Sequence, residues 1–280
     1  MKKIKILLPI IILVIAAYII IIIISGRKKD EDKLTIKRGS NDTESVSSSS
    51  DADDGGKMQA DSDEIDSGKE AFSADAVSTA GIVINGEEVP EYVDEPYAQI
   101  NYNEPFFTKD ELKTESFERF SEFDELGRCG KVEACIGIDI IPQAERSEIP
   151  GDIKPTGWHI AKYEGKIEGD YLFNRCHLID YQLTGNNTEV KNFITGTEYF
   201  NVEGMLPFEN MVARYVEKTG NHVMYRVTPY YKGDNLLATG VLMEAYSVED
   251  DGMGVFFNAF IYNVQPGIEI DYSTGESRLK

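Results

Sequence analysis

The residues that could do chemistry gather around one histidine. His177 lies in the stretch YLFNRCHLIDYQ, between an apolar, strand-like run and a turn-like segment, and it is one of three histidines in the chain. An imidazole has an unperturbed pKa of about 6.5, so near neutral pH it can take a proton from an attacking group. The local sequence leaves two interpretations open, a packed core histidine and the base of an active site.

Polar residues follow His177 where a helix is expected to begin. After the turn LTGNNTEV the chain reads KNFITGTEYFNVEGMLPFE, which carries Asn192, Asn201 and Glu209. On local sequence alone, Asn201 can be a helix N-cap and Glu209 a first-turn carboxylate that interacts with the helix dipole. An amide oxygen is also a donor that a hard divalent cation accepts. The pattern therefore indicates either helix capping or a metal site.

The three cysteines, Cys129, Cys135 and Cys176, do not have the spacing of a disulfide framework or of a zinc site. Cys129 and Cys135 are close enough in sequence for one bridge between them. Cys176, next to His177, is considered as a nucleophile, although the partners of a catalytic cysteine meet in space and not by adjacency. The other two histidines, His159 and His222, lack such surroundings and are interpreted as structural.

The first 29 residues predict a membrane anchor. Leu7 to Ile24 is an almost unbroken apolar run with lysines before it and the basic segment RKK after it, about long enough to span a bilayer as a helix. A cleaved signal peptide is the alternative, but its apolar core is usually shorter and ends in a small-x-small site. Basic residues flank both ends, and a large domain after a single span is more often outside. The expectation is a single-pass membrane protein with an extracellular C-terminal domain.

Residues 30–80 are rich in Ser, Asp, Glu and Gly and have few large apolar side chains. Such a segment cannot bury enough surface to offset its ordering entropy, so it predicts a disordered acidic tether. The net charge of the chain is −21, and from Pro105 onward 17 Lys and Arg against 29 Asp and Glu still give −12. General attraction to a polyanion is therefore excluded, and action on nucleic acid would need a local basic site or a metal ion.

Residues 81–280 predict one globular domain. GIVINGEEVPEYV, Gly81 to Val93, alternates apolar and polar residues around an Asn-Gly turn and predicts a small hairpin. Thr108 to Phe117 has a helical pattern. The clearest helix is PFENMVARYVEKTG, with Pro207 in its first turn and Gly220 at its C-terminal cap.

The remaining apolar segments predict the strands of a sheet. VEACIGIDIIP is expected to be a core strand closed by Pro142, and WHIAKY a short strand after a Pro/Gly turn. Three more strands are expected after the helix, in HVMYRVTPYY, GVLMEAYSVE and VFFNAFIYNV. The fold class is therefore α+β, with a mostly antiparallel central sheet and flanking helices.

The order of strand, His177, loop and helix-entering segment resembles the ββα-metal finger of the DNA/RNA non-specific endonucleases. It is most similar to the membrane-anchored DNA-entry nucleases of Gram-positive bacteria. The resemblance runs roughly from Leu126 to the C-terminus and is carried by LGR, KPTGWH, NRCHL, KNFITGT, YRVTPYY and NVQPGIEIDYSTGE. The family hallmark is Asp-Arg-Gly-His, and here Asn174, Arg175, Cys176 and His177 stand at those positions. Two of the four depart from it.

The resemblance implies roles for individual residues. His177 would be the general base that activates water, Asn201 the direct ligand of Mg²⁺ (or Mn²⁺), and Glu209 the holder of metal-bound waters. Arg128 is grouped with His177 and Glu209 in the catalytic set. Supporting residues are Asn174, Arg175 and Asn192, and Arg175 is expected to pair with an acidic neighbour.

The implied function is a membrane-anchored, Mg²⁺-dependent, sequence-nonspecific endonuclease that cuts DNA, with RNA as a second substrate. Its partners would be the nucleic acid and, through the N-terminal helix, the membrane, and no protein partner is predicted. The alternative is a non-catalytic, surface-tethered binding module that retains the nuclease fold. Two features support that alternative, the altered hallmark and the small number of basic residues, but the endonuclease is the first hypothesis.

Overall fold

The computed structural model of this protein describes residues 78–146 and 148–280. The expected anchor and nearly all of the expected tether lie outside these residues. Within them, no helix combines the length and the apolar composition needed to cross a bilayer.

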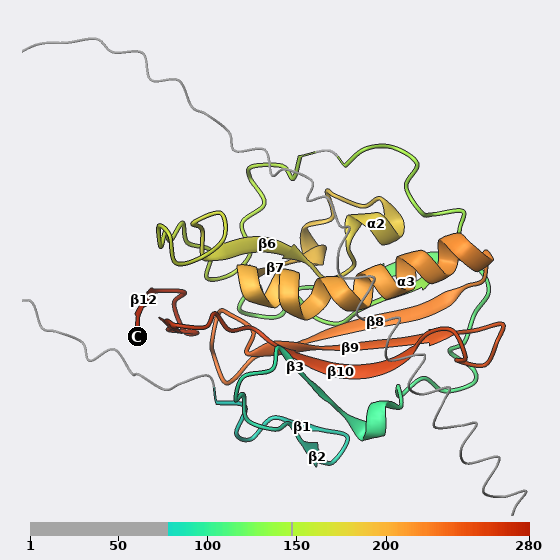
Figure 1. Cartoon of the computed structure of the whole chain (residues 1–280), viewed down its shortest axis with the longest axis horizontal. Coiled ribbons are helices and arrows are strands. Elements are labelled where there is room, and N and C mark those ends of the chain that lie inside the picture. The colour runs from blue at the N-terminus through green and yellow to red at the C-terminus, as the bar shows by residue number, and fades with distance from the viewer. Residues whose placement is uncertain (1–77, 147) are drawn as a thin grey trace, which may run out of the picture. The chain divides into compact units, whose positions relative to one another are not determined.

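Alternating apolar residues build a six-stranded sheet at the centre of the described chain (Figure 1). All of its neighbouring strands are antiparallel. The strands predicted around VEACI, HVMYRVTPYY, GVLMEAYSVE and VFFNAFIYNV are confirmed, and so is the α+β class. In spatial order the strands are β3 (Tyr97–Gln99), β10 (Phe256–Tyr262), β9 (Gly240–Ser247), β8 (Val223–Tyr230), β5 (Val132–Ile136) and β4 (Phe117–Phe120).

Both faces of this sheet are covered, which is why its inner strands are buried along nearly their whole length. One face packs against helix α3 (Leu206–Thr219) and the β6–β7 hairpin. The other face carries Leu242, Phe260 and Tyr262, which pack against the N-terminal segment that begins the described chain. Figure 1 shows these two coverings on opposite sides of the sheet.

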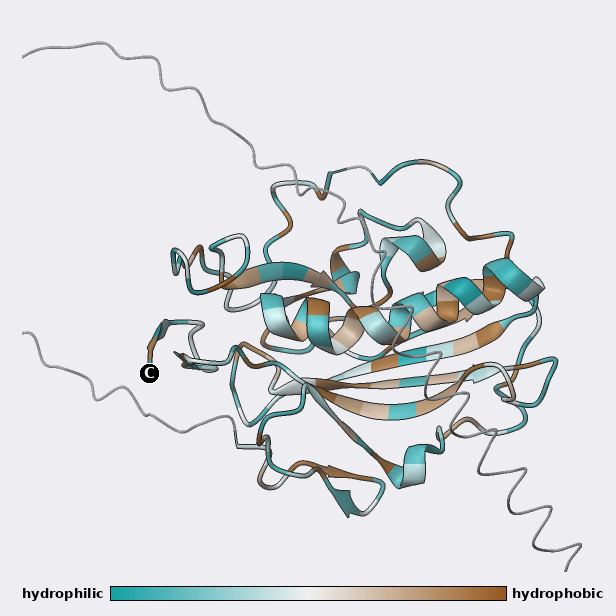
Figure 2. Ribbon diagram, in the orientation of Figure 1, coloured by the Kyte–Doolittle hydropathy of each residue, from teal (hydrophilic) through white to brown (hydrophobic). Residues whose placement is uncertain are grey.

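Helix α3 forms where the sequence predicts it. Phe208, Val212 and Val216 recur on one face and are buried against the sheet. Figure 2 shows hydrophobic and hydrophilic positions alternating along this helix. Gly220 ends the helix with a φ of 72°, a left-handed conformation that glycine adopts without strain, and its N–H donates to the Val216 carbonyl at 2.8 Å.

A π-helical turn, η4 (Phe200–Met205), precedes α3 and changes the interpretation of Asn201. The residue at the N-cap of α3 is Met205, and no side chain caps the helix there. Asn201 lies inside the π turn, where its backbone carbonyl accepts the Leu206 N–H. The capping interpretation of Asn201 is therefore wrong, and its side chain is available for another role.

The β6–β7 hairpin supplies the two strands before that helix. β6 (Phe173–His177) pairs with β7 (Phe193–Thr197), with His177 opposite Phe193. A Cβ on Gly196 of β7 would lie 2.6 Å from the Cys176 sulfur and from the Phe200 ring. A glycine is thus required for η4 to pack against the hairpin. The connection between the strands holds two short helices, α2 (Tyr181–Thr184) and η3 (Val190–Asn192).

Two small hairpins and one short helix complete the described chain. The predicted hairpin at Gly81–Val93 is confirmed, with its turn at Asn85 and Gly86, where φ is 48° and 91°. The polar C-terminal end also folds back on itself, which the sequence did not predict. These elements are β1 (Val83–Ile84), β2 (Glu87–Glu88), η2 (Asn101–Asn103), β11 (Ile268–Ile270) and β12 (Ser277–Leu279).

Two element predictions are wrong. The helix expected over Thr108–Phe117 is a turn followed by strand β4, because TKDELKTES has no apolar stripe to bury. Glu111 instead accepts hydrogen bonds from the backbone and hydroxyl of Thr108 at 2.7 and 2.8 Å and pairs with Arg226. The strand expected in WHIAKY is reduced to a single bridge between Lys162 and Tyr171.

The cysteine bridge is also not formed, and all three cysteines are free and buried. The Cys129 thiol contacts the Phe193 carbonyl at 3.0 Å, whereas the Cys135 thiol contacts the Lys113 carbonyl at 3.1 Å. The two thiols therefore have separate partners in the core.

Candidate active site

His177 ends strand β6 and is 5% exposed. Its ring packs against Phe193, with 4.4 Å between ring centroids. Nε2 lies 2.9 Å from the Asn187 side-chain oxygen, and Nδ1 lies 3.3 Å from a guanidinium nitrogen of Arg146. A guanidinium can only donate, so Nδ1 is the acceptor and Nε2 carries the proton that is donated to Asn187. This assignment leaves a lone pair on Nδ1.

The surroundings of His177 keep its imidazole uncharged. The pKa of His177 is lowered to about 4, chiefly by burial of the ring, and the Arg146 guanidinium acts in the same direction. The Asp180 carboxylate, 3.9 Å from Nδ1, and the hydrogen bond to Asn187 act in the opposite direction. At neutral pH the ring is therefore neutral and able to accept a proton.

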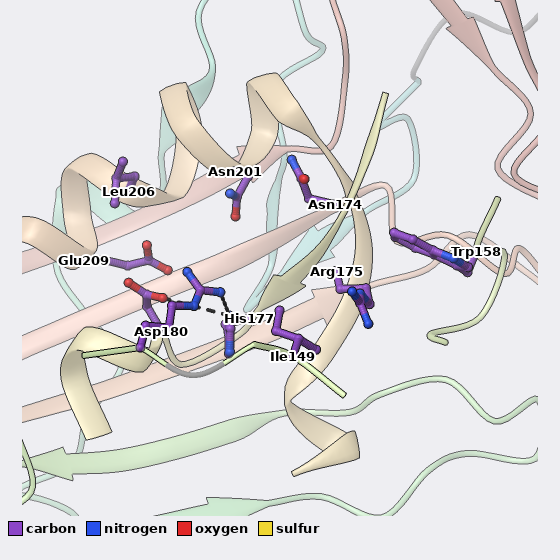
Figure 3. Close-up of a pocket in the computed structure, with 10 residues that line it drawn as sticks. Ile149, Trp158, Asn174, Arg175, His177, Asp180, Asn201, Leu206 and Glu209 are labelled. Atoms are coloured by element: carbon purple, nitrogen blue, oxygen red, sulfur yellow. Dashed lines mark hydrogen bonds and ion pairs between the residues drawn. The ribbon is translucent and has the colours of Figure 1, made fainter. Parts of the chain in front are cut away.

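A cavity of about 370 Å³ opens beside this ring. Figure 3 shows side chains from the hairpin, the π turn and α3 converging on it. The sequence predicted that His177, Asn201 and Glu209 share one site, and the structure brings these three side chains to the same cavity. The full lining is Arg146, Ile149, Trp158, Asn174, Arg175, His177, Asp180, Asn201, Leu206 and Glu209.

Glu209 is a buried carboxylate on α3, with 4% of its surface exposed. Within the described part of the chain it has no hydrogen-bond partner. Burial, together with the nearby Asp180 carboxylate, raises the pKa of Glu209 well above its ordinary value, and Arg146 only partly opposes this. A buried carboxylate without a partner is costly, and a cation in the cavity would relieve that cost.

Asn201 reaches the cavity from the π turn and is half-buried. Its side-chain amide makes no hydrogen bond to any described residue. Across residues 78–146 and 148–280, no three His, Cys, Asp or Glu side chains group closely enough to hold a metal ion by themselves. One amide oxygen, the Glu209 carboxylate and water match the preference of Mg²⁺, which keeps several of its waters. The donor set therefore fits such an ion.

Comparison with known proteins identifies the family. Residues 108–249 match the profile described as DNA/RNA non-specific endonuclease, which is just over half of the chain. The chain belongs to this family. The hairpin β6–β7 and helix α3 are accordingly the ββα unit of a ββα-metal nuclease.

Individual relatives agree with this membership. A curated deoxyribonuclease of Streptococcus dysgalactiae subsp. equisimilis is 34% identical over 117 residues, a match that spans 40% of this chain and 35% of that relative. The chain thus covers about a third of the length of this relative. NucA from Streptococcus agalactiae, solved with a magnesium ion bound, superposes with a TM-score of 0.59 and 26% identity, over 68% of this chain and 89% of NucA.

A third relative shares the fold alone. The Sda1 nuclease, solved with a bound zinc ion, has a TM-score of 0.56 and 22% identity over 66% of this chain and 97% of Sda1.

Asn174, the first departure from the family hallmark, has a hydrogen-bond partner in Glu198, the residue that follows β7. Its side-chain nitrogen donates a short hydrogen bond to the carboxylate of Glu198. Burial raises the pKa of Glu198, whereas this hydrogen bond lowers it. An aspartate at position 174 would set two carboxylates against each other, so the asparagine is matched to its neighbour.

Asn174→Asp is expected to destabilise the nuclease at neutral pH by about 1–3 kcal/mol, because Glu198 loses its donor and gains a like charge. Thermal unfolding measured from neutral to acidic pH is the check. The difference from the parent protein should shrink as one of the two carboxyls becomes protonated. A loss of stability that is equal at all pH values would rule out charge repulsion as the cause.

The second departure, Cys176, is excluded as a nucleophile by its position. Its side chain is 1% exposed and lies in the main hydrophobic core next to Gly196. Burial raises the pKa of the Cys176 thiol well above its ordinary value. A thiol without access to the cavity and without thiolate character cannot attack a substrate.

Arg175 differs from its prediction. No described carboxylate pairs with it. Its guanidinium donates to the Pro150 carbonyl at 2.8 Å and lies 5.8 Å from the centre of the Trp158 ring. Arg175 lines the cavity, so it places a positive charge at the cavity wall.

Two predicted residues lie outside the cavity lining. Asn192 is fully buried, and its side chain bonds both the N–H and the carbonyl of Ile179 at 2.8 and 2.9 Å, which fixes the chain just after His177. Arg128 bonds Asp124 at 2.7 Å and the Gly233 carbonyl at 2.7 Å. The structure thus gives both residues contacts that hold loops together.

Three site residues were missed by the sequence interpretation: Arg146, Asp180 and Asn187. Asp180 follows His177 by three residues, and Asn187 follows it by ten, in the polar turn LTGNNTEV. An acidic or amide residue soon after a histidine could have been predicted as its hydrogen-bond partner. Arg146 comes from a long loop after β5 and has no sequence signal, because only the fold brings that loop to the hairpin.

In metal-free protein, an NMR titration of His177 is expected to give a pKa near 4. Asp180→Asn should lower it further, and Arg146→Gln should raise it, since the two side chains act in opposite directions. The folded-state pKa lies below the ordinary value, so the stability linked to His177 is full above about pH 6.5 and falls as the pH drops toward 4. A midpoint at about 6.5 would contradict the buried, neutral imidazole.

Proposed function

We propose that this protein is a Mg²⁺-dependent, sequence-nonspecific endonuclease that hydrolyses phosphodiester bonds of DNA, with RNA as a second substrate. Family membership supports the reaction class, and the magnesium ion in the NucA structure supports the ion. One observation carries the proposal. A neutral, buried imidazole shares a cavity with the buried Glu209 carboxylate and the Asn201 amide, neither of which has a hydrogen-bond partner among the described residues.

The chain would hold the ion through the Asn201 amide oxygen directly and through Glu209 by way of waters. When bound, a divalent ion supplies positive charge to the phosphate and to the leaving 3′ oxygen. Among residues 78–146 and 148–280, the cavity offers few acidic ligands, so most of the coordination would come from solvent.

His177 would act as the general base. Nδ1 accepts a proton from the water that attacks phosphorus, and the Asp180 carboxylate at 3.9 Å stabilises the imidazolium that results. The hydrogen bond from Nε2 to Asn187 holds the ring orientation during this transfer. Arg146, which contacts Nδ1 in this structure, would turn to the phosphate and offset its charge.

Asn201→Ala is expected to remove most of the Mg²⁺-dependent cleavage and to weaken Mg²⁺ binding, because the direct amide ligand is lost. The melting temperature without metal should stay close to that of the parent protein, since the amide makes no hydrogen bond within residues 78–146 and 148–280. Calorimetric Mg²⁺ titration and cleavage rate are the two measurements. Asn235→Ala, outside the cavity lining, is the matched control, and an unchanged rate in Asn201→Ala would remove Asn201 from its role.

We further propose that residues 7–24 anchor the protein in a membrane with the nuclease domain outside. The support is the apolar run and its basic flanks. Fractionation of cells that express the full chain, followed by protease treatment of intact cells, tests this. Recovery of the chain from the soluble fraction, or protection of the domain from protease, would contradict it.

A non-catalytic binding module is the second candidate function. The observations that favour it are the replaced hallmark positions Asn174 and Cys176 and the net charge of −12 from Pro105 onward. A plasmid-nicking assay of the full chain with Mg²⁺ or with EDTA separates the two. Nicking that requires Mg²⁺ supports the endonuclease, and a plasmid that stays supercoiled in both supports the binding module.

A further inference from the structure

Trp158 is the only tryptophan in the chain, and it lines the active-site cavity. In the view of Figure 3 it lies at one end of the labelled side chains and Glu209 at the other. The indole is partly exposed and packs on one side against a small core cluster. Part of a large aromatic surface is thus left open beside the catalytic groups.

The turn that carries this indole is held rigidly. The Thr156 hydroxyl donates to the Leu236 carbonyl at 2.6 Å, and the Thr156 carbonyl accepts from the Thr195 hydroxyl at 2.9 Å. Gly157 has a φ of 66°, and a Cβ there would lie only 2.0 Å from a methyl group of Leu237. The ring is therefore pre-positioned and would lose little conformational freedom when it binds a ligand.

Arg175 adds a positive charge to the part of the cavity lining that Trp158 forms. Its guanidinium lies over the Trp158 ring, 5.8 Å from the ring centre, and the one hydrogen bond of this side chain to the described residues goes to the Pro150 carbonyl. It precedes His177 by two residues on β6, a distance of about 6.6 Å along a strand. Because side chains two residues apart on a strand lie on the same face, Arg175 and His177 share one face of β6.

We propose that Trp158 and Arg175 form a stacking platform for the nucleobase next to the cleaved phosphodiester, so that single-stranded or unpaired nucleic acid binds more tightly than intact duplex. The inference rests on the proposed nuclease function. A base inside a duplex has both faces stacked and must be extruded before it can use the platform. The cavity, at about 370 Å³, is near the lower limit of ligand pockets, a size that suits a single extruded nucleotide.

Binding to the full chain in EDTA tests the platform without cleavage. The ligands are a short oligothymidylate, a sugar–phosphate oligomer of the same length without bases, and a duplex. Stacking on the single tryptophan should quench its fluorescence with oligothymidylate and leave it unchanged with the abasic oligomer. The duplex should bind about tenfold more weakly than the single strand.

Substitutions of Trp158 test whether its indole ring causes the tighter binding of oligothymidylate. Binding of labelled oligothymidylate, measured by anisotropy, should weaken about tenfold in Trp158→Leu and stay near the parent value in Trp158→Phe, because phenylalanine keeps an aromatic face. Tyr171→Leu is the control, since this exposed aromatic is outside the cavity lining. Thermal unfolding shows whether each variant is folded, and the quenching comparison needs no variant at all.

The outcomes separate this inference from the nuclease proposal. Equal quenching by the base-bearing and abasic oligomers, or equal affinity in folded Trp158→Leu, overturns the platform even if Mg²⁺-dependent nicking persists. Base-dependent quenching in a chain that never nicks DNA overturns the nuclease proposal and leaves the platform as a binding site.

Discussion

His177→Ala is expected to lower the rate of phosphodiester cleavage at neutral pH by about a hundredfold to ten-thousandfold, the contribution of a positioned general base. The loss follows from the geometry. Nδ1 is the neutral acceptor in the cavity, and the ring is held in that tautomer by the hydrogen bond from Nε2 to Asn187. The initial rate of plasmid nicking at saturating Mg²⁺ is the measurement.

The same substitution removes a hydrogen-bond donor from the buried Asn187, which is expected to cost about 1–3 kcal/mol of stability. The rate must therefore be compared at a temperature where thermal unfolding shows that the variant is folded. His222→Ala is the matched control, because His222 pairs with Glu249 outside the cavity lining. If folded His177→Ala cleaves as fast as the parent protein, another group must be the base.

Glu209→Gln is expected to have opposite effects on stability and on activity. In the parent protein the folded-state pKa of Glu209 is raised, so the folded protein is penalised once the pH rises above the ordinary value of this carboxyl. Without metal, the variant should therefore melt at a higher temperature than the parent at neutral pH, and the two should converge in acid. Cleavage and Mg²⁺ affinity should fall by about 10- to 100-fold, as for other residues that orient metal-bound groups.

Melting curves in EDTA and in Mg²⁺ over a range of pH measure both effects. Mg²⁺ should stabilise the parent protein more than the variant, since the ion compensates the buried carboxylate. Glu217→Gln, on the exposed face of the same helix, should change neither quantity. A variant that is less stable than its parent at neutral pH without metal would show that the Glu209 carboxylate has an internal partner and is not held for a cation.

The sequence predicted best where local pattern and burial agree. Helix α3 and strands β8 to β10 follow from their apolar periodicity, because those same residues face the core. His177, Asn201 and Glu209 were grouped through the family resemblance, and the hairpin and helix do bring them to one cavity. Their catalytic and metal-binding roles stay predictions.

The rest depended on contacts between distant segments. Arg146 reaches His177 across 31 residues, and no local pattern marks a long loop that folds over a hairpin. The predicted helix at Thr108–Phe117 failed because helix-forming polar residues without an apolar face gain nothing from packing. Arg128 was placed in the catalytic set through the family resemblance, while its hydrogen bonds join two surface loops.

The three unpaired cysteines bear on the redox conditions in which this domain can fold. With every thiol free and enclosed in the core, the fold relies on packing and hydrogen bonds and needs no covalent cross-link. It should form equally well in reducing and oxidising surroundings. Such a fold can reach its native state without any thiol oxidant or disulfide isomerase, whichever side of a bilayer it folds on.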